Sequence, residues 1–196
     1  MTSSPRRTPR VSVERCTGDY DIMSTYRKAT AADIPAVCQI YADVHTVEES
    51  GPVTTGWKRE TYPVRETAEE ALARDDLFVQ ETGSVITGTA IINRLQVDVY
   101  AGAPWRYPAP DEEVMVLHTL AISPKAARRG LATDFVDFYA RYALEHGCRY
   151  LRIDTNEKNA PARALYKKLG FAEVTVVPCT FNGLEHIRLL LLEKRL

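Results

Sequence analysis

Apolar residues in the first part of the chain recur at helical spacing. Within residues 29–45 the apolar positions three to four residues apart are Ile34, Val37, Tyr41 and Val44. Thr30 stands three residues before Asp33, which is the spacing of a capping box at a helix start. Residues 65–76 repeat the amphipathic pattern, whereas residues 48–62 lack a clear period and are expected to be mostly loop. This part of the chain therefore predicts two helices.

Short apolar and β-branched runs follow, as expected of strands. Residues 77–82 and 84–96 are predicted to be two strands joined by a turn at Gly83. Three prolines interrupt residues 99–113, which are therefore predicted to be a loop. Residues 114–123 form an apolar run that is too short and too rich in β-branched residues for a buried helix, so they predict a central strand.

The second half predicts a helix, a strand, a helix and a hairpin. The helix after Gly130 has one apolar stripe, formed by Leu131, Phe135, Phe138 and Tyr142. Gly147 ends this helix, and residues 150–155 are the next predicted strand. Residues 159–170 form a helix that Asn159 opens and a glycine closes. The last two predicted strands, residues 173–181 and 184–196, flank Asn182-Gly183, a strong signal for a two-residue turn.

These elements predict a mixed α/β fold in a single domain over residues 24–196. Residues 1–23 are rich in Arg, Ser, Thr and Pro and are expected to form a disordered arm. The formal net charge of −1 argues against a nucleic-acid binder, and no apolar segment is long enough to span a membrane. The four cysteines have neither CxxC nor Cys/His ligand spacing, which favours a reducing, cytoplasmic location and no structural metal.

The segment at residues 126–139 suggests an anion site. Backbone N–H groups at a helix start are unsatisfied and favour phosphate, and Gly130 lets a ligand approach without a Cβ. Arg128 and Arg129 add charged donors beside it. The chain has neither GxxxxGK[ST] nor GxGxxG, so the familiar nucleotide loops do not account for this segment.

Two motifs carry a resemblance to the GNAT acetyltransferases. Residues 127–132, Ala-Arg-Arg-Gly-Leu-Ala, resemble the pyrophosphate loop [RQ]xxGx[GA] of that family, although Ala127 stands where Arg or Gln is preferred. Residues 159–171, "NAPARALYKKLGF", match the family pattern of an Asn, a Tyr and a terminal Gly-Phe at every marked position. Residues 26–37 resemble the family's first strand and helix, and the resemblance covers roughly residues 24–196.

The resemblance implies a fold, a cofactor and an activity. The fold is a mostly antiparallel sheet flanked by helices, with the fourth and fifth strands splayed apart. The activity is direct transfer of acetyl from acetyl-CoA to a primary amine of a small molecule or protein, without a metal. A coenzyme A sensor with little turnover is the alternative, and a homodimer is common among relatives. The residues implied in cofactor binding are Leu120, Ala121, Ile122, Arg128, Arg129, Gly130, Leu131, Ala132, Thr133 and Asn159.

Two residues are candidates for proton transfer. The family position of Tyr166 implies that it protonates the departing thiolate, and the ordinary tyrosine pKa of about 10 suits that task. His118, in the predicted central strand, is the candidate base, because imidazole titrates near neutral pH. Family members often carry an acidic residue on this strand where Val116 stands here, and Glu112 and Glu113 just upstream are the alternatives.

Acceptor binding is expected to involve loop residues. Four aromatic residues lie in loops where the family forms its acceptor pocket: Trp57, Tyr62, Trp105 and Tyr107. The Asn182-Gly183 turn borders that pocket in relatives, and Cys179 and His186 flank the turn as weaker candidates. Arg152 and Asp154 alternate on one strand and are expected to form an ion pair within the protein.

Overall fold

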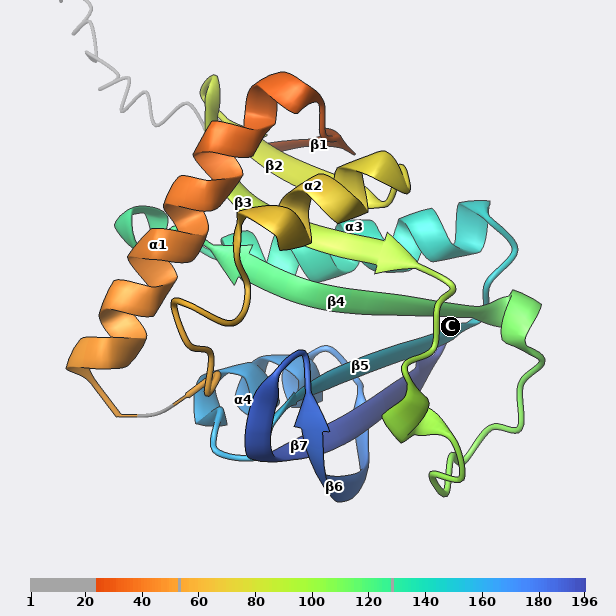
Figure 1. Cartoon of the computed structure of the whole chain (residues 1–196). Helices are drawn as coiled ribbons and strands as arrows, with labels where there is room; N and C mark the ends of the chain where they lie inside the picture. The colour runs from red at the N-terminus through yellow and green to blue at the C-terminus, as the bar shows by residue number, and fades with distance from the viewer. Residues whose placement is uncertain (1–23, 53, 128) are drawn as a thin grey trace, which may run out of the picture.

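The computed structural model describes residues 24–52, 54–127 and 129–196, so the predicted arm at residues 1–23 lies outside the described part. These residues form a seven-stranded sheet with helices on both faces (Figure 1). The strands are β1 (Ser24–Lys28), β2 (Leu77–Thr82), β3 (Val85–Asn93), β4 (Val114–Ile122), β5 (Tyr150–Asn156), β6 (Ala172–Phe181) and β7 (Leu184–Arg195). The α-helices are α1 (Ile34–Ser50), α2 (Arg65–Ala73), α3 (Leu131–Glu145) and α4 (Ala160–Lys168).

The sheet contains one parallel pair at its centre. The strand order is β1-β2-β3-β4-β5-β7-β6, and only β4 and β5 run parallel. Their pairing extends from Val114 opposite Tyr150 to Leu117 opposite Ile153. Beyond that point β4 continues to Ile122 and β5 to Asn156 without pairing to each other. The predicted mixed sheet with splayed fourth and fifth strands is thus confirmed.

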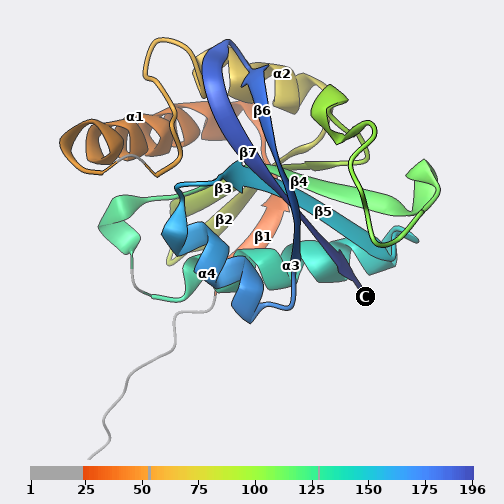
Figure 2. The ribbon, with the colours of Figure 1, turned by 90° about the horizontal axis from the view of Figure 1, so that it is seen from below.

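The four helices cover opposite faces of the sheet. Figure 2 shows α1 and α2 on one side and α3 and α4 on the other. Under α1 and α2 lies a core that includes Val37, Tyr41 and Val79, and under α3 and α4 lies a larger one. A third apolar cluster forms where the loop between β3 and β4 packs through Tyr100 onto β4 and β7. Burial of these apolar surfaces holds the layers together.

Most predicted elements are present, and the main difference in boundaries concerns the first helix. The expected loop from residue 48 begins later, because α1 continues to Ser50. The Glu48 carboxylate accepts N–H bonds from Thr54 (2.8 Å) and Gly56 (2.9 Å). These bonds attach the last turn of the helix to the loop that follows, a tertiary contact that helical periodicity does not reveal.

The described residues lack several features that define other protein classes. None of the helices in residues 24–52, 54–127 and 129–196 has the length and hydrophobicity needed to cross a bilayer. Over the same residues, no three His, Cys, Asp or Glu side chains are grouped as metal ligands would be. Cys38, Cys148 and Cys179 are free thiols.

Tyr139 of α3 connects the helix to the paired part of β4 and β5. The predicted stripe placed Phe138 and Tyr142 inward, but both are only half-buried, whereas Tyr139 is fully buried. Its hydroxyl lies 2.6 Å from the carbonyl oxygen of Met115 and 3.2 Å from that of Arg152. These two carbonyls belong to β4 and β5, so one hydroxyl contacts both strands just before they separate.

We predict that Tyr139→Phe destabilises the fold by about 1–3 kcal/mol, because it leaves buried carbonyl groups without their donor. Tyr142→Phe on the same helix is the matched control. Its hydroxyl makes no hydrogen bond within the described residues, so its effect should stay within about 0.5 kcal/mol. Urea denaturation of both variants measures the difference. Equal stability of the two variants would contradict the proposed link between α3 and the strand pair.

Candidate functional site

A cavity of about 890 Å³ lies where β4 and β5 separate. Residues 117–123 of β4 and the turn after it line one wall, and residues 154–156 of β5 line another. The start of α3, the helix α4, the loop after α1, α2 with Arg74 after it, the end of β3 and the β6–β7 hairpin also contribute to the lining. The cavity therefore forms where the central pair of the sheet ends, and elements from most of the described chain surround it.

The wall formed by β4 contains a β-bulge. His118 pairs with Ile91 and Ala121 with Thr89, so two residues of β4 lie opposite one residue of β3. One of them, Thr119, has a φ of 51°, which is unusual for a β-branched residue. Such a conformation costs of order 1–3 kcal/mol and persists only where neighbouring contacts hold it. Here the Thr119 hydroxyl is hydrogen-bonded to the Tyr62 hydroxyl.

The predicted phosphate loop has the geometry that its sequence suggests. Gly130 is the residue before α3 and has a φ of 76°, a conformation that favours glycine. A Cβ at this position would find no atom within 4 Å, so the space above the loop is open. Gly130, Leu131, Ala132 and Thr133 all line the cavity. The N–H groups of the first helical turn have no acceptor within the helix, and their residues border an open part of the cavity.

Of the two arginines of the loop, only Arg129 belongs to the described residues. Arg128 lies outside the described residues, so its predicted role stays a prediction. Arg129 is exposed and does not belong to the cavity lining.

The second predicted motif brings Asn159 and Tyr166 to the cavity on α4. The Asn159 side chain caps the helix, accepting from the Ala162 amide (3.3 Å) and donating to the Thr155 hydroxyl (3.1 Å). Tyr166 is 5% exposed, and its ring lies 5.8 Å from that of Phe171. Burial, and next the negative charge of Asp154, raise the pKa of Tyr166 well above its usual value. Its hydroxyl therefore stays protonated and available as a donor.

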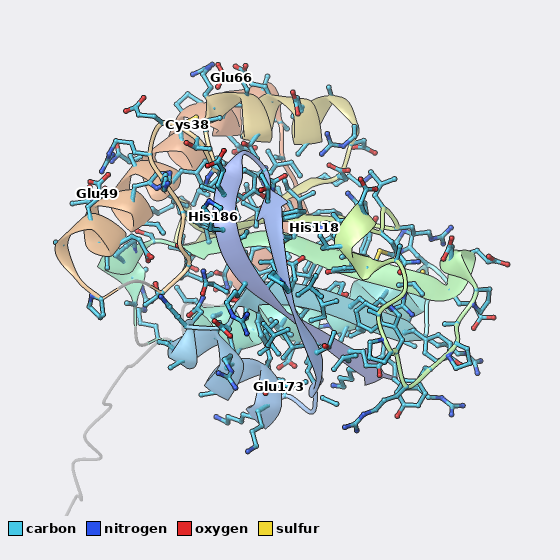
Figure 3. All side chains as sticks on the ribbon, turned by 60° about the horizontal axis from the view of Figure 1, so that its bottom comes forward. Cys38, Glu49, Glu66, His118, Glu173 and His186 are labelled. Atoms are coloured by element: carbon cyan, nitrogen blue, oxygen red, sulfur yellow. The ribbon has the colours of Figure 1, made fainter. Side chains whose placement is uncertain are left out.

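His118 lies on β4 and lines the cavity (Figure 3). Its Nε2 lies 3.1 Å from the side-chain oxygen of Asn93 and 3.2 Å from the carbonyl oxygen of Leu95. Because both partners are acceptors, Nε2 carries the proton and Nδ1 is the unprotonated nitrogen. Burial lowers the pKa of His118 to about 4, so the imidazole is neutral at pH 7 and is a weak base.

Asp154 is a cavity residue whose importance the sequence reasoning missed. Its carboxylate accepts a hydrogen bond of 2.9 Å from the Tyr100 hydroxyl, and burial raises its pKa to about 6. A carboxylate that titrates near neutral pH in a cavity is suited to proton transfer. The only signal in the sequence was the place of Asp154 near the carboxyl end of the strand predicted at residues 150–155.

The predicted ion pair between Arg152 and Asp154 does not form. The Arg152 guanidinium lies 4.0 Å from the ring centre of Trp105 and donates to the side chain of Gln96. The loop between β3 and β4 thus provides a separate site for the arginine, and Asp154 remains without a cationic partner among the described residues.

Two of the four predicted acceptor aromatics line the cavity. Trp57 and Tyr62 do so, with ring centres 6.0 Å apart in an edge-to-face arrangement. Trp105 packs beneath Arg152, and Tyr107 lies 5.8 Å from the ring of Tyr150, so neither belongs to the cavity lining. The prediction is wrong for these two because the loop that carries them folds over β5 and β7 instead.

The remaining candidates also divide by position. Asn182 of the hairpin turn lines the cavity, whereas Cys179 and His186 border a separate depression on the hairpin (Figure 3). Glu112 and Glu113 precede the first residue of β4, at the opposite end of the strand from the splayed residues. They are not part of the cavity lining, so the structure does not bring them to the site.

Comparisons with known proteins agree with this geometry. Residues 35–171 match the model of the acetyltransferase (GNAT) family. A GNAT-family acetyltransferase from Streptococcus agalactiae has a similar structure, with a TM-score of 0.73 and 22% identity over 88% of this chain and 95% of its own. A ribosomal-protein-alanine N-acetyltransferase from Brucella melitensis gives a TM-score of 0.64 and 21% identity over 88% and 99%.

A third similar structure was solved with its cofactor acetyl-CoA. It is an acetyltransferase from Salmonella typhimurium, with a TM-score of 0.61 and 18% identity over 88% of this chain and 93% of its own. Comparison with curated protein sequences gives no match. The family match spans more than half of the chain, and the fold of the solved structures agrees with it. The chain therefore belongs to the GNAT family of acetyltransferases.

Proposed function

We propose that this protein transfers acetyl from acetyl-CoA to a primary amine within one ternary complex, with Asp154 as general base and Tyr166 as general acid. The observation that carries the proposal is a half-buried carboxylate, Asp154, which lines the same cavity as the predicted phosphate loop and has a pKa of about 6 because of desolvation. The same cavity thus contains the proposed site for the phosphates of acetyl-CoA and the proposed base for the amine.

The residues around the cavity fit coenzyme A. The open loop at Gly130 and the N–H groups of Leu131, Ala132 and Thr133 suit its pyrophosphate. Residues 118–122 of β4 have no partner on the β5 side, so Leu120, Ala121 and Ile122 supply backbone groups that an extended pantetheine arm can use. Asn159 also lines the cavity, and we assign its side chain to the pantetheine arm. Bound acetyl-CoA supplies the thioester carbonyl that the amine nitrogen attacks.

The chain's own residues then manage the protons. Asp154 takes one proton from the substrate ammonium, which leaves a neutral amine. A C–N bond forms as the C–S bond breaks, and Tyr166 donates a proton to the departing sulfur. The nitrogen loses its second proton, which restores Tyr166, so the products are the amide, the free thiol and one proton released to solvent.

The pKa values of the two residues favour Asp154 over His118 as the base. A pKa of about 4 makes His118 a weaker proton acceptor than Asp154 at about 6. Both residues line the cavity, so His118 suits a contact with the acceptor or a bridging water.

The alternative to an enzyme is a coenzyme A sensor, which binds the cofactor without turnover. Release of coenzyme A from acetyl-CoA in the presence of a panel of amines distinguishes the two, because only the enzyme releases it.

We predict that Gly130→Glu lowers the affinity for acetyl-CoA by at least about tenfold, because a side chain and a negative charge would meet the pyrophosphate. Gly102→Glu is the matched control. Gly102 has a φ of 73° and open space around its Cβ, as Gly130 does, but lies away from the cavity. Calorimetric titration with acetyl-CoA measures both, and equal losses would reject the loop assignment.

We predict that Asp154→Asn lowers kcat by about 10²- to 10⁴-fold, as expected for loss of a general base. In the native protein, kcat should fall as the pH drops below about 6, because a protonated Asp154 cannot accept a proton. This inflection should be absent in the variant. The pH profile of kcat with the best amine of the panel measures both effects.

Tyr100→Phe provides the control for this assignment. The hydrogen bond from Tyr100 lowers the pKa of Asp154, so its removal should move the inflection to higher pH while leaving the carboxylate in place. An unchanged pH profile in both variants would show that another group is the base.

We predict that Tyr166→Phe lowers kcat about a hundredfold while the affinity for acetyl-CoA stays largely unchanged. Phenylalanine keeps the ring and its packing on Phe171 and removes only the proton donor. Steady-state kinetics and calorimetry separate the two quantities. Native turnover in the variant would limit Tyr166 to packing.

A further inference from the structure

Few charged side chains line the cavity, and only some of them are paired with a side chain of opposite charge. Among the described lining residues they are Glu70, Arg74 and Asp154. Arg74 is paired with Asp76, with Nε 3.0 Å from Oδ2 and Nη2 3.3 Å from Oδ1. Asp76 is 6% exposed and also accepts a bond of 2.8 Å from the Asn93 side chain. The only cation of the described lining is therefore already matched by a fixed carboxylate.

The two carboxylates have no such compensation. Asp154 has only the Tyr100 hydroxyl as a hydrogen-bond donor, and Glu70 forms no ion pair within the described part of the chain. His118 is neutral at pH 7, because burial holds its pKa at about 4. The uncompensated charge of the described lining residues is therefore negative, which favours a cationic ligand and opposes a second carboxylate.

Apolar side chains line much of the same cavity. Trp57 and Tyr62 form an aromatic corner, and Leu184, Ile187 and Leu189 of β7 contribute aliphatic side chains. Aromatic faces attract ammonium groups, and aliphatic walls favour uncharged substrate surface. An acceptor that fits both features has a cationic amino group on an apolar body.

We propose that the acceptor is a primary amine carried on an apolar aryl or alkyl body, without a carboxylate beside the amino group. This inference rests on the proposed function, because it concerns the amine that the same site acetylates. An amino acid would bring its carboxylate close to Asp154, and Arg74 is not available to neutralise it.

Matched amine and amino-acid pairs test the proposal. Tryptamine and tryptophan differ only in the carboxylate, as do phenethylamine and phenylalanine. We expect each amine to bind the coenzyme A-bound protein at least about tenfold more tightly than its amino acid, by calorimetry. The kcat/KM for coenzyme A release from acetyl-CoA should favour the amine by a similar factor. Equal binding, or a preference for the amino acids or for spermidine, would overturn the proposal.

Charge variants identify the origin of the selectivity. Asp76→Asn removes the partner of Arg74 and should narrow the preference for tryptamine over tryptophan about tenfold. Because Asp76 is buried, Glu70→Gln on the exposed face of α2 serves as a second variant that keeps the fold, and it should narrow the preference in the same direction. Glu66→Gln is the control, since Glu66 is also exposed on α2 (Figure 3) but does not line the cavity.

The two readouts separate this inference from the proposed function. Selective binding of the amines without coenzyme A release would uphold the acceptor class and reject the proposed catalysis. Coenzyme A release with amino acids as the better acceptors would uphold catalysis and reject the acceptor class. An unchanged preference in both charge variants would also reject the electrostatic basis proposed here.

Discussion

Strands β4 and β5 pair in parallel only from Val114 to Leu117, and the geometry of the site depends on where this pairing stops. Below that point the Tyr139 hydroxyl contacts carbonyl groups of both strands. Above it the bulge at Thr119 changes the course of β4, and Tyr62 holds the bulge from the other face. Backbone groups that lose a strand partner in a buried place need another partner. A ligand that lies between the strands can supply it, which supports the proposal that coenzyme A binds where the pairing ends.

In the cavity between the two strands, the charge of the proposed base influences the pKa of the proposed acid. The negative charge of Asp154 contributes to the raised pKa of Tyr166. When Asp154 accepts a proton from the substrate, that charge disappears and Tyr166 becomes the stronger acid at the stage when the sulfur departs. The loop between β3 and β4 takes part in this arrangement, because Tyr100 donates to Asp154 and Trp105 holds Arg152 away from it. A cationic partner for Asp154 would lower its pKa and weaken the base.

Sequence patterns predicted the elements that local interactions specify. The turn at Asn182-Gly183 and the cap at Asn159 depend on neighbours close in the chain, and both are present. The apolar run at residues 114–123 indicated its own burial and so predicted the central strand, which the structure gives as β4. The splay of β4 and β5 was expected from resemblance alone, since no residue pattern encodes where a parallel pair stops. The raised pKa of Asp154 could not be predicted, because the alternation of Arg152 and Asp154 along the strand suggested that the two form an ion pair. The competing partner of Arg152, Trp105, lies 47 positions earlier in a loop whose path depends on tertiary packing.

The proposed coenzyme A side and the proposed acceptor side of the cavity are formed by different kinds of groups. The proposed coenzyme A side relies on backbone groups of consecutive residues, at 120–122 and 130–133, so its sequence signature is compact. The proposed acceptor side relies on side chains from the loop after α1, from α2 and from β7, which are far apart in sequence. Under this proposal, a change of charge there, such as in the Arg74–Asp76 pair, alters which amine fits and leaves unchanged the backbone groups proposed to hold the donor. The proposed acceptor class is therefore set by side-chain charge, and the proposed coenzyme A site is set by the backbone.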